Sequence, residues 1–175
     1  IRARVCLLRD LGAPLAPDNA WGIIQGLETA PLRMKQHCSN AEKTVDFLKK
    51  HKNVQKVIYP TLHEGEIAAR SKKYLKGGNG ALVGIELKGG VEAGKKFIES
   101  LKMFYHVANI GDARSLAIHP ATTTHSQLTP EELLAAGVTP GYVRLSIGIE
   151  HADDIIEDLN QALNSSGKSN LKAVS

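Results

Sequence analysis

The sequence contains no apolar run long enough to cross a membrane. No uninterrupted stretch approaches the roughly 18 apolar residues that a membrane span requires. The start of the chain, Ile1–Arg9, has no extended apolar region of the kind found in signal peptides. We therefore expect a cytoplasmic protein with no membrane partner. Because the first residue is Ile1 and not methionine, we also expect the chain to be part of a longer protein.

Cysteine and aromatic residues are scarce. The two cysteines, Cys6 and Cys38, lie far apart and match no metal-ligand spacing, which favours two reduced thiols and no metal site. Aromatic residues make up 5% of the chain, and the Lys and Arg residues behind its formal net charge of +4 are spread along it. Nucleic-acid-binding proteins instead combine a basic groove with aromatic stacking platforms, so we expect no nucleic-acid partner.

Nucleotide-binding loops and recognisable nucleophiles are also missing from the sequence. No Gly-x-Gly-x-x-Gly motif follows a predicted strand, no P-loop lysine occurs, and no Ser, Cys or Lys lies in a known nucleophile motif. A complete active site is therefore not expected in this chain. A length of 175 residues, with 42% hydrophobic and 23% charged residues, is typical of one ordinary globular domain.

Apolar residues at three- and four-residue steps predict helices that alternate with short strands. The first helical pattern runs from Asp18 to His51, and Pro31 should break or bend it. Further along, the sequence predicts strands at 54–59, 81–87, 104–110, 115–118 and 142–149, and helices at 64–75, 91–103, 129–136 and 151–164. This alternation indicates an α/β sandwich in which helices cover one face of a single sheet of about four or five strands.

The chain should have three parts. Pro14 and Pro17 predict an extended lead-in over residues 1–17, and residues 18–164 should form the folded domain. The polar residues 165–175 should form a flexible tail.

One arginine lies in the middle of a strongly alternating strand. Over residues 142–149 the alternation places Arg144 and Ser146 on one face, opposite a face of valine, leucine and isoleucine. A guanidinium held in this way presents a planar fork that matches a carboxylate or phosphate. The alternative from the strand alone is an arginine on the solvated face of an edge strand.

Small and polar residues are concentrated just before this strand. Asn109 and Gly111 have the composition of a turn, although an exposed backbone N–H beside Gly111 could serve an anion. His119 and His125 are six residues apart across Pro120, which does not match a helical metal pair. Hydrogen bonds that fix a loop are the better interpretation of both histidines.

These motifs together resemble the C-terminal part of the pyridoxal-phosphate enzymes of cysteine and methionine metabolism. The resemblance covers Leu8 to Leu163, and within this group the segment from Asn109 to Leu128 is most similar to O-acetylhomoserine sulfhydrylases. The motifs that carry the resemblance are Gln25-Gly26-Leu27-Glu28-Thr29, Leu32-Arg33-Met34, Gly111-Asp112 through His119-Pro120-Ala121, and Val143-Arg144-Leu145-Ser146-Ile147-Gly148-Ile149-Glu150.

The resemblance implies the fold and the site. The fold would be the small C-terminal domain of fold-type-I transferases, with a mixed, largely antiparallel sheet. Arg144 would bind the substrate's α-carboxylate, with Asn109 beside it, and Gly111, Thr124 and His125 would support the site loop.

The resemblance also implies the partners. The substrate would be O-acetylhomoserine, and the full-length protein would be a homo-oligomer, a tetramer. Pyridoxal 5'-phosphate would be bound covalently by an N-terminal domain that this chain lacks, so the chain alone should be inactive. Two alternatives remain open: the same domain of a sister enzyme (methionine γ-lyase, cystathionine γ-synthase or γ-lyase), or a free-standing, non-catalytic binding domain.

Overall fold

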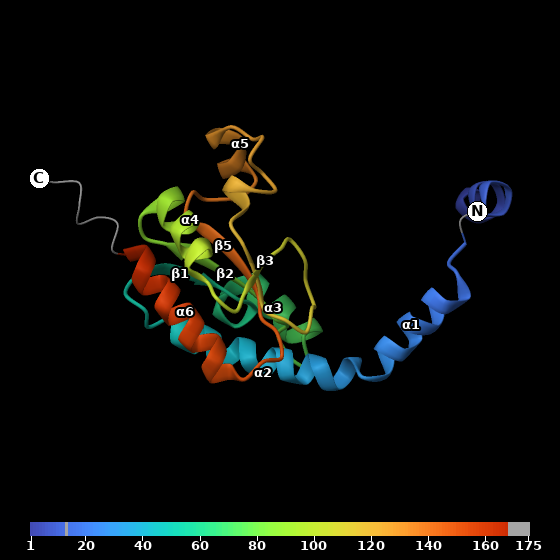
Figure 1. Cartoon of the computed structure of the whole chain (residues 1–175), viewed down its shortest axis with the longest axis horizontal. Coiled ribbons are helices and arrows are strands. Elements are labelled where there is room, and N and C mark those ends of the chain that lie inside the picture. The colour runs from blue at the N-terminus through green and yellow to red at the C-terminus, as the bar shows by residue number, and fades with distance from the viewer. Residues whose placement is uncertain (13, 168–175) are drawn as a thin grey trace, which may run out of the picture. The chain divides into compact units, whose positions relative to one another are not determined.

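The computed structural model describes residues 1–12 and 14–167 (Figure 1). The chain divides into two compact units, Ile1–Arg33 and Met34–Ser175, which are described separately. The boundary between the two units lies at residues 33 and 34. The assignment of residues 18–164 to a single domain stays a prediction.

The first unit is helical throughout most of its length. Ala3–Leu11 forms a π-helix, η1, where the sequence predicted an extended lead-in. Helix α1 spans Pro17–Glu28, with proline in its first turn, and helix α2 begins at Ala30. The predicted interruption beside Pro31 is confirmed, because α1 ends at Glu28 and α2 starts two residues later.

The second unit contains a mixed five-stranded sheet in the order β1-β2-β5-β4-β3. Its strands are β1 (Val54–Ile58), β2 (Leu82–Leu87), β3 (Tyr105–His106), β4 (Leu116–Ile118) and β5 (Tyr142–Ser146). The pairs β1–β2, β2–β5 and β4–β5 are antiparallel, and only β3–β4 is parallel. The predicted fold class, a mixed and largely antiparallel sheet with helices, is confirmed.

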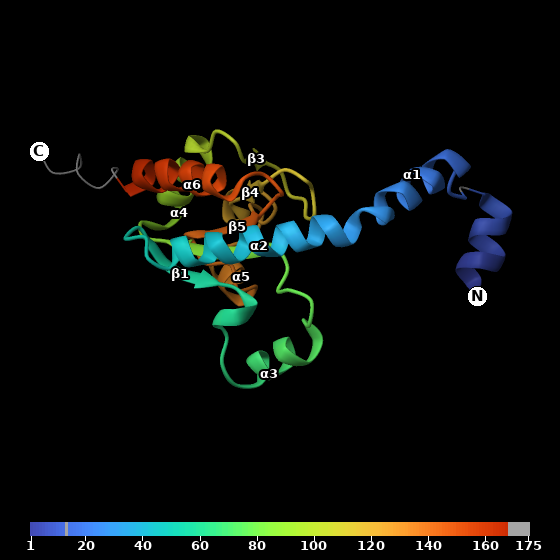
Figure 2. The same cartoon turned by 90° about the horizontal axis from the view of Figure 1, so that it is seen from below.

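Three helices pack on one face of this sheet (Figure 2). They are α2 (Ala30–Leu48), α4 (Gly90–Ser100) and α6 (Ala152–Ser166). Their buried side chains form one core with alternate residues of β2 and β5, in which Ile85 pairs with Val143 and Val83 with Leu145. Because side chains alternate across a strand, Arg144 and Ser146 lie on the opposite face.

Helices α3 (Gly65–Tyr74) and α5 (Pro130–Ala135) complete the second unit, with short 3-10 turns η2 (Pro60–Leu62) and η3 (Pro120–Thr122). Thr129 caps α5, and Glu132 completes the reciprocal capping box, as the start signal at Thr129 predicted. Part of the predicted tail continues α6 to Ser166, and residues 168–175 lie outside the described residues.

The segment between β3 and β4 differs from the prediction. The sequence indicated two strands around a turn at Gly111, but only Tyr105–His106 and Leu116–Ile118 are strands, and they run parallel. The intervening loop 107–114 makes its hydrogen bonds to β5 and the residues just after it, such as Gly111 N–H to Ser146 Oγ and Ile149 N–H to Ala113 O. These hydrogen bonds to β5 and the residues after it replace the strand-to-strand hydrogen bonds that a hairpin would form.

Among residues 1–12 and 14–167, no helix is both long enough and apolar enough to cross a membrane. In the same residues, no three His, Cys, Asp or Glu side chains are grouped so that they could hold a metal ion.

Candidate functional site

Arg144 lies on the central strand of the sheet. β5 is hydrogen-bonded to β2 on one side and β4 on the other, and Arg144 pairs with Gly84 and Ile118. The alternative of an edge-strand arginine is therefore wrong. Arg144 is half-buried, and no Asp or Glu among the described residues forms an ion pair with it. A guanidinium in this position has donors available for an added anion.

Asn109 lies directly beside this guanidinium. Arg144 Nη2 donates to the backbone carbonyl of Asn109 at 3.4 Å. The side-chain Oδ1 of Asn109 accepts the N–H of Ile110 at 2.9 Å, which fixes the amide group. Because Oδ1 is used in this way, the remaining polar atom of the side chain is the donor Nδ2. The structure thus brings together the two residues that the sequence predicted for carboxylate binding.

Beside Arg144, the ring of Tyr142 lies close to the backbone of Gly84. A methyl group at Gly84 would lie 2.8 Å from the ring of Tyr142, so the missing side chain of Gly84 is what lets this ring lie across β2. Burial raises the pKa of Tyr142, and the positive charge of Arg144 lowers it in part. Tyr142 therefore stays a neutral neighbour of Arg144 at neutral pH and does not compete with an anion for its charge.

Gly111 is fixed to the same strand face. Its N–H donates to Ser146 Oγ at 3.4 Å, two residues beyond Arg144. Its backbone has φ +73°, in the region that favours glycine. Next to this bond, Asp112 Oδ1 accepts the N–H of Arg114 at 3.0 Å and closes a side-chain turn. Gly111 is therefore part of the site, but its N–H binds Ser146 and does not point to a free anion position.

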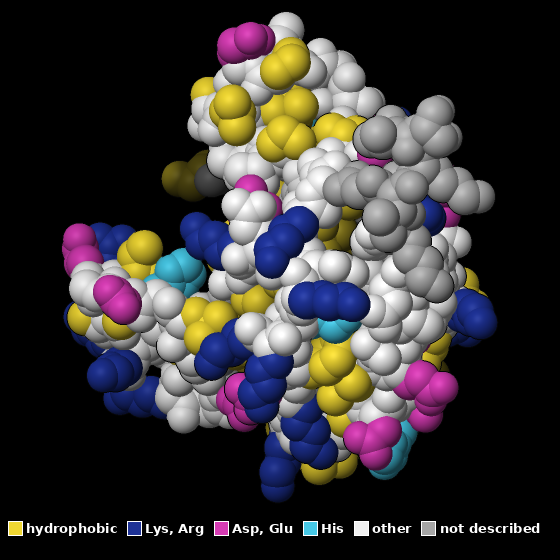
Figure 3. Space-filling model, turned by 90° about the vertical axis from the view of Figure 1, so that its left-hand side faces the viewer, with side chains coloured by type: hydrophobic (Ala, Val, Ile, Leu, Met, Phe, Trp, Pro, Cys, Tyr) yellow, Lys and Arg dark blue, Asp and Glu magenta, His cyan; other side chains and the backbone are white. Residues whose placement is uncertain are grey.

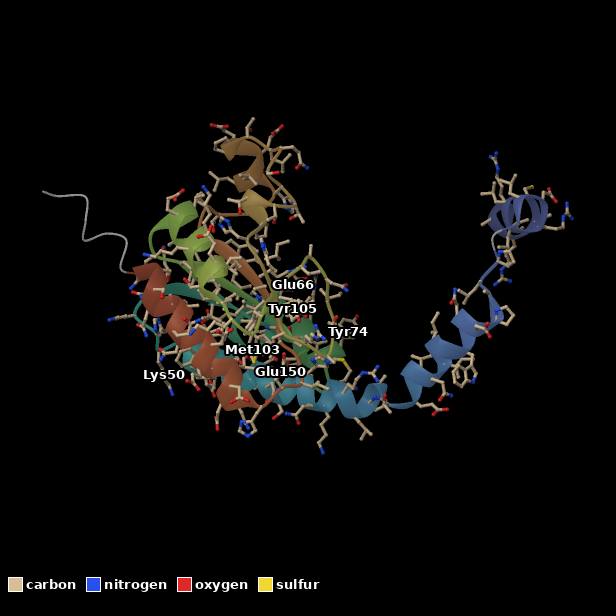
Figure 4. The ribbon with its side chains drawn as sticks, viewed as in Figure 1. Lys50, Glu66, Tyr74, Met103, Tyr105 and Glu150 are labelled. Atoms are coloured by element: carbon tan, nitrogen blue, oxygen red, sulfur yellow. The ribbon has the colours of Figure 1, made fainter. Side chains whose placement is uncertain are left out.

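A hydrogen-bonded cluster holds the far end of the loop. Glu150 accepts the N–H of Ser115 at 2.6 Å and its hydroxyl at 2.9 Å, and the Ser115 hydroxyl accepts the N–H of Gly148 at 2.8 Å. Asn40 on α2 donates to the carbonyls of Gly148 and Glu150, at 3.0 and 2.7 Å. Figure 4 labels Glu150 near α2. The cluster connects the loop, the end of β5 and the helical layer.

The sequence did not single out Ser115, Ser146 or Glu150 as individual site residues. The available signal was the continued alternation of polar and small residues at 144, 146, 148 and 150, which runs past the end of the strand. What the alternation could not reveal is which loop these side chains hold.

Thr124 and His125 lie in the segment 120–128. Thr124 Oγ1 and His125 Nδ1 are hydrogen-bonded at 2.8 Å, and His125 N–H donates to Pro120 O at 3.0 Å. Within the described residues, their hydrogen bonds stay inside this segment. The structure therefore does not join them to Arg144 by a direct bond, and their support of the site loop stays a prediction.

His119 fixes a loop, as the sequence predicted. Its ring nitrogens lie 2.8 Å from Thr122 Oγ1 and 2.8 Å from Pro140 O. Burial lowers the pKa of His119, although the hydrogen bond to Pro140 raises it in part. A neutral imidazole with both nitrogens in hydrogen bonds stabilises the fold of its loop.

A cavity of about 410 Å³ adjoins the site. Its lining includes Leu82, Ile110, Gly111 and Ser146, so it lies next to the Gly111–Ser146 bond. His37 also lines it, and its Nδ1 lies 2.7 Å from Ile147 O. Because a carbonyl oxygen can only accept, the Nδ1 of His37 carries the hydrogen of this bond.

The surface carries a group of basic side chains (Figure 3). Lys and Arg side chains gather in the middle of the face shown in Figure 3, with acidic side chains among them and at the rim. The absence of a nucleic-acid partner stays a prediction.

Comparison with known proteins decides the family. A family model described as Cys/Met metabolism PLP-dependent enzyme matches residues 2–164. The chain belongs to this family.

The similar proteins include sulfhydrylases and a lyase. The chain is 57% identical over 164 residues to an O-acetyl-L-homoserine sulfhydrylase of Leptospira meyeri, covering 93% of this chain and 37% of the relative. It is 48% identical over 160 residues to an L-methionine gamma-lyase of Fusobacterium nucleatum subsp. polymorphum, covering 89% and 40%.

A crystal structure from Campylobacter jejuni, assigned as an O-acetylhomoserine (thiol)-lyase, matches with a TM-score of 0.85 and 47% identity over 94% of this chain and 39% of that one. The chain thus spans about two fifths of the length of the relatives that it matches.

The family depends on pyridoxal phosphate, and the Campylobacter jejuni protein carries a pyridoxyl-lysine phosphate at its position 205, outside the region that this chain matches. The lysines described in this chain do not fit that role. Among residues 1–12 and 14–167, every lysine is exposed except the half-buried Lys96 on α4. A lysine that binds the cofactor must lie in the substrate pocket, so the described lysines do not fit that role.

Proposed function

We propose that this chain is the C-terminal, substrate-carboxylate-binding domain of a pyridoxal-phosphate-dependent O-acetylhomoserine sulfhydrylase. The full-length enzyme would convert O-acetylhomoserine and sulfide to homocysteine and acetate, a step of methionine biosynthesis. The observation that carries the proposal is the half-buried guanidinium of Arg144 beside Asn109, with no acidic partner among the described residues. The names of the relatives support the choice of reaction.

Arg144 would bind the α-carboxylate with its fork of N–H donors. The Asn109 carbonyl accepts one N–H of this fork, which sets the plane of the guanidinium, and Asn109 Nδ2 would add a further donor. Fixing the amino acid at its carboxylate presents its Cα–H bond in one orientation to groups of the N-terminal domain. The bound cofactor supplies an electron sink for the carbanion. Without that domain, this chain would be inactive.

The N-terminal domain of the same protein would also be a packing partner. Helix α1 has no buried residue and exposes Trp21, Ile24 and Leu27, whose three-residue spacing forms an apolar stripe. Exposed apolar stripes mark interaction surfaces. We assign this stripe to contacts within the full-length enzyme, which we further propose to be a cytoplasmic homotetramer.

A γ-lyase is the second candidate, because an L-methionine gamma-lyase is 48% identical to the chain. Product analysis of the full-length enzyme separates the two. With O-acetylhomoserine and sulfide, a sulfhydrylase forms homocysteine and acetate. With methionine and water but no added nucleophile, a γ-lyase forms a thiol, a keto acid and ammonia. The second pattern without the first would overturn the proposal.

A further inference from the structure

Alternate residues of β5 and its continuation bind the loop 107–114 in order. Arg144 contacts Asn109, Ser146 contacts Gly111, and Gly148 and Glu150 contact Ser115, the residue at which the loop enters β4. Side chains two residues apart lie on one strand face. The loop therefore lies along the Arg144 face of β5, with Asn109 at one end of the contacts and Ser115 at the other.

The two ends of this loop are held unequally. At Ser115 three hydrogen bonds of 2.6–2.9 Å join the loop to Glu150 and Gly148. At the other end β3 has only two residues, and both are exposed. Between them, Gly111 borders the 410 Å³ cavity, so packed atoms do not support it from that side. Near Asn109, the hydrogen bonds that join the loop to β5 are Arg144 Nη2 to the Asn109 carbonyl and Gly111 N–H to Ser146 Oγ. The second of these holds the backbone two residues beyond Asn109, ahead of the bond from Ile149 N–H to Ala113 O.

We propose that Ser146 is a positioning residue for the carboxylate site. By accepting the N–H of Gly111, its hydroxyl holds Asn109 where the backbone carbonyl meets Arg144 Nη2. Loss of this bond frees the Asn109 carbonyl, and with it the plane of the guanidinium that donates to it. Ser146 itself does not touch the substrate. This inference rests on the proposed role of Arg144 in carboxylate binding.

The test uses the full-length enzyme and the substitution Ser146→Ala. Removal of one hydrogen bond should raise the KM for the amino-acid substrate by about threefold to tenfold, with little change in kcat or in the KM for sulfide. Ser146→Thr keeps the hydroxyl, and the adjoining cavity has room for its methyl group, so this variant should restore the KM. Ser71→Ala on α3 makes the same chemical change away from the loop and should leave the KM unaltered.

A double-mutant cycle distinguishes positioning from a general structural effect. If Ser146 acts through Arg144, Ser146→Ala should add no further rise in KM to an Arg144→Ala enzyme. Suppose that Arg144→Ala raises the KM. The inference is then overturned if the two substitutions raise the KM additively, or if the Ser146→Ala enzyme has the wild-type KM. If Arg144→Ala leaves the KM unchanged, the proposed function fails and this inference fails with it.

Discussion

Gly94 on α4 faces the ring of the buried His119, and adding one methyl group there should destabilise the second unit. A Cβ at position 94 would lie 2.5 Å from His119 Nε2 and 2.6 Å from Cδ2. The ring cannot move away freely, because its two nitrogens are bonded to Thr122 and Pro140. Gly94→Ala therefore forces either the helix or the imidazole to shift.

The expected magnitude follows from three effects. Overpacking of a core costs about 1–3 kcal/mol, and loss of the His119–Pro140 hydrogen bond costs about 0.5–1.5 kcal/mol. Alanine favours a helix over glycine by about 1 kcal/mol, which offsets part of this loss. The free energy of unfolding should fall by about 1–3 kcal/mol on balance.

Urea unfolding of this chain, followed by far-UV circular dichroism, measures the change as a lower midpoint at unchanged slope. The matched control is Gly77→Ala, since a Cβ at Gly77 would meet nothing within 4 Å. It should shift stability by no more than about 0.5 kcal/mol. A Gly94→Ala protein as stable as wild type would refute the packing of α4 against His119.

Two further predictions concern the same unit. Burial lowers the pKa of His119 and of His51 from 6.5, so the folded state binds these protons less readily than the unfolded chain. The free energy of unfolding should therefore fall as the pH drops below about 6.5. Urea titrations from pH 8 to 5 measure this dependence on pH, which should be weaker in His119→Gln. A wild-type free energy of unfolding that is independent of pH would contradict the prediction. Asp158 accepts the N–H groups of Lys102, Met103 and Phe104. Asp158→Ala should lower the free energy of unfolding by about 2–4 kcal/mol because buried N–H groups lose their partner, and Asp158→Asn by less; equal stability of all three proteins would exclude this role.

Local patterns in the sequence were sufficient to predict most of the elements. Helical spacing, proline and capping residues placed α1 to α6 within a few residues, because these signals act over one or two turns. The alternation around Arg144 predicted which face of β5 is buried, and Val143 and Leu145 are fully buried as expected.

Long-range contacts were not predictable in the same way. Whether Gly111 ends a hairpin or crosses β5 depends on Ser146, 35 residues away, and no local pattern contains that information. The central place of β5 likewise depends on strand order. In the first unit, the spacing of apolar residues correctly predicted the helix α1. The same spacing did not reveal that the apolar side chains of α1 are exposed.

The central claim is that Arg144 binds the substrate's carboxylate, and steady-state kinetics of an Arg144→Ala full-length enzyme test it most directly. Removing one partner of a desolvated charge pair costs on the order of 2–5 kcal/mol, so the KM for O-acetylhomoserine should rise at least about 30-fold. The KM for sulfide, which has no carboxylate, should change little. A wild-type KM for the amino acid, or an equal rise for both substrates, would contradict the account.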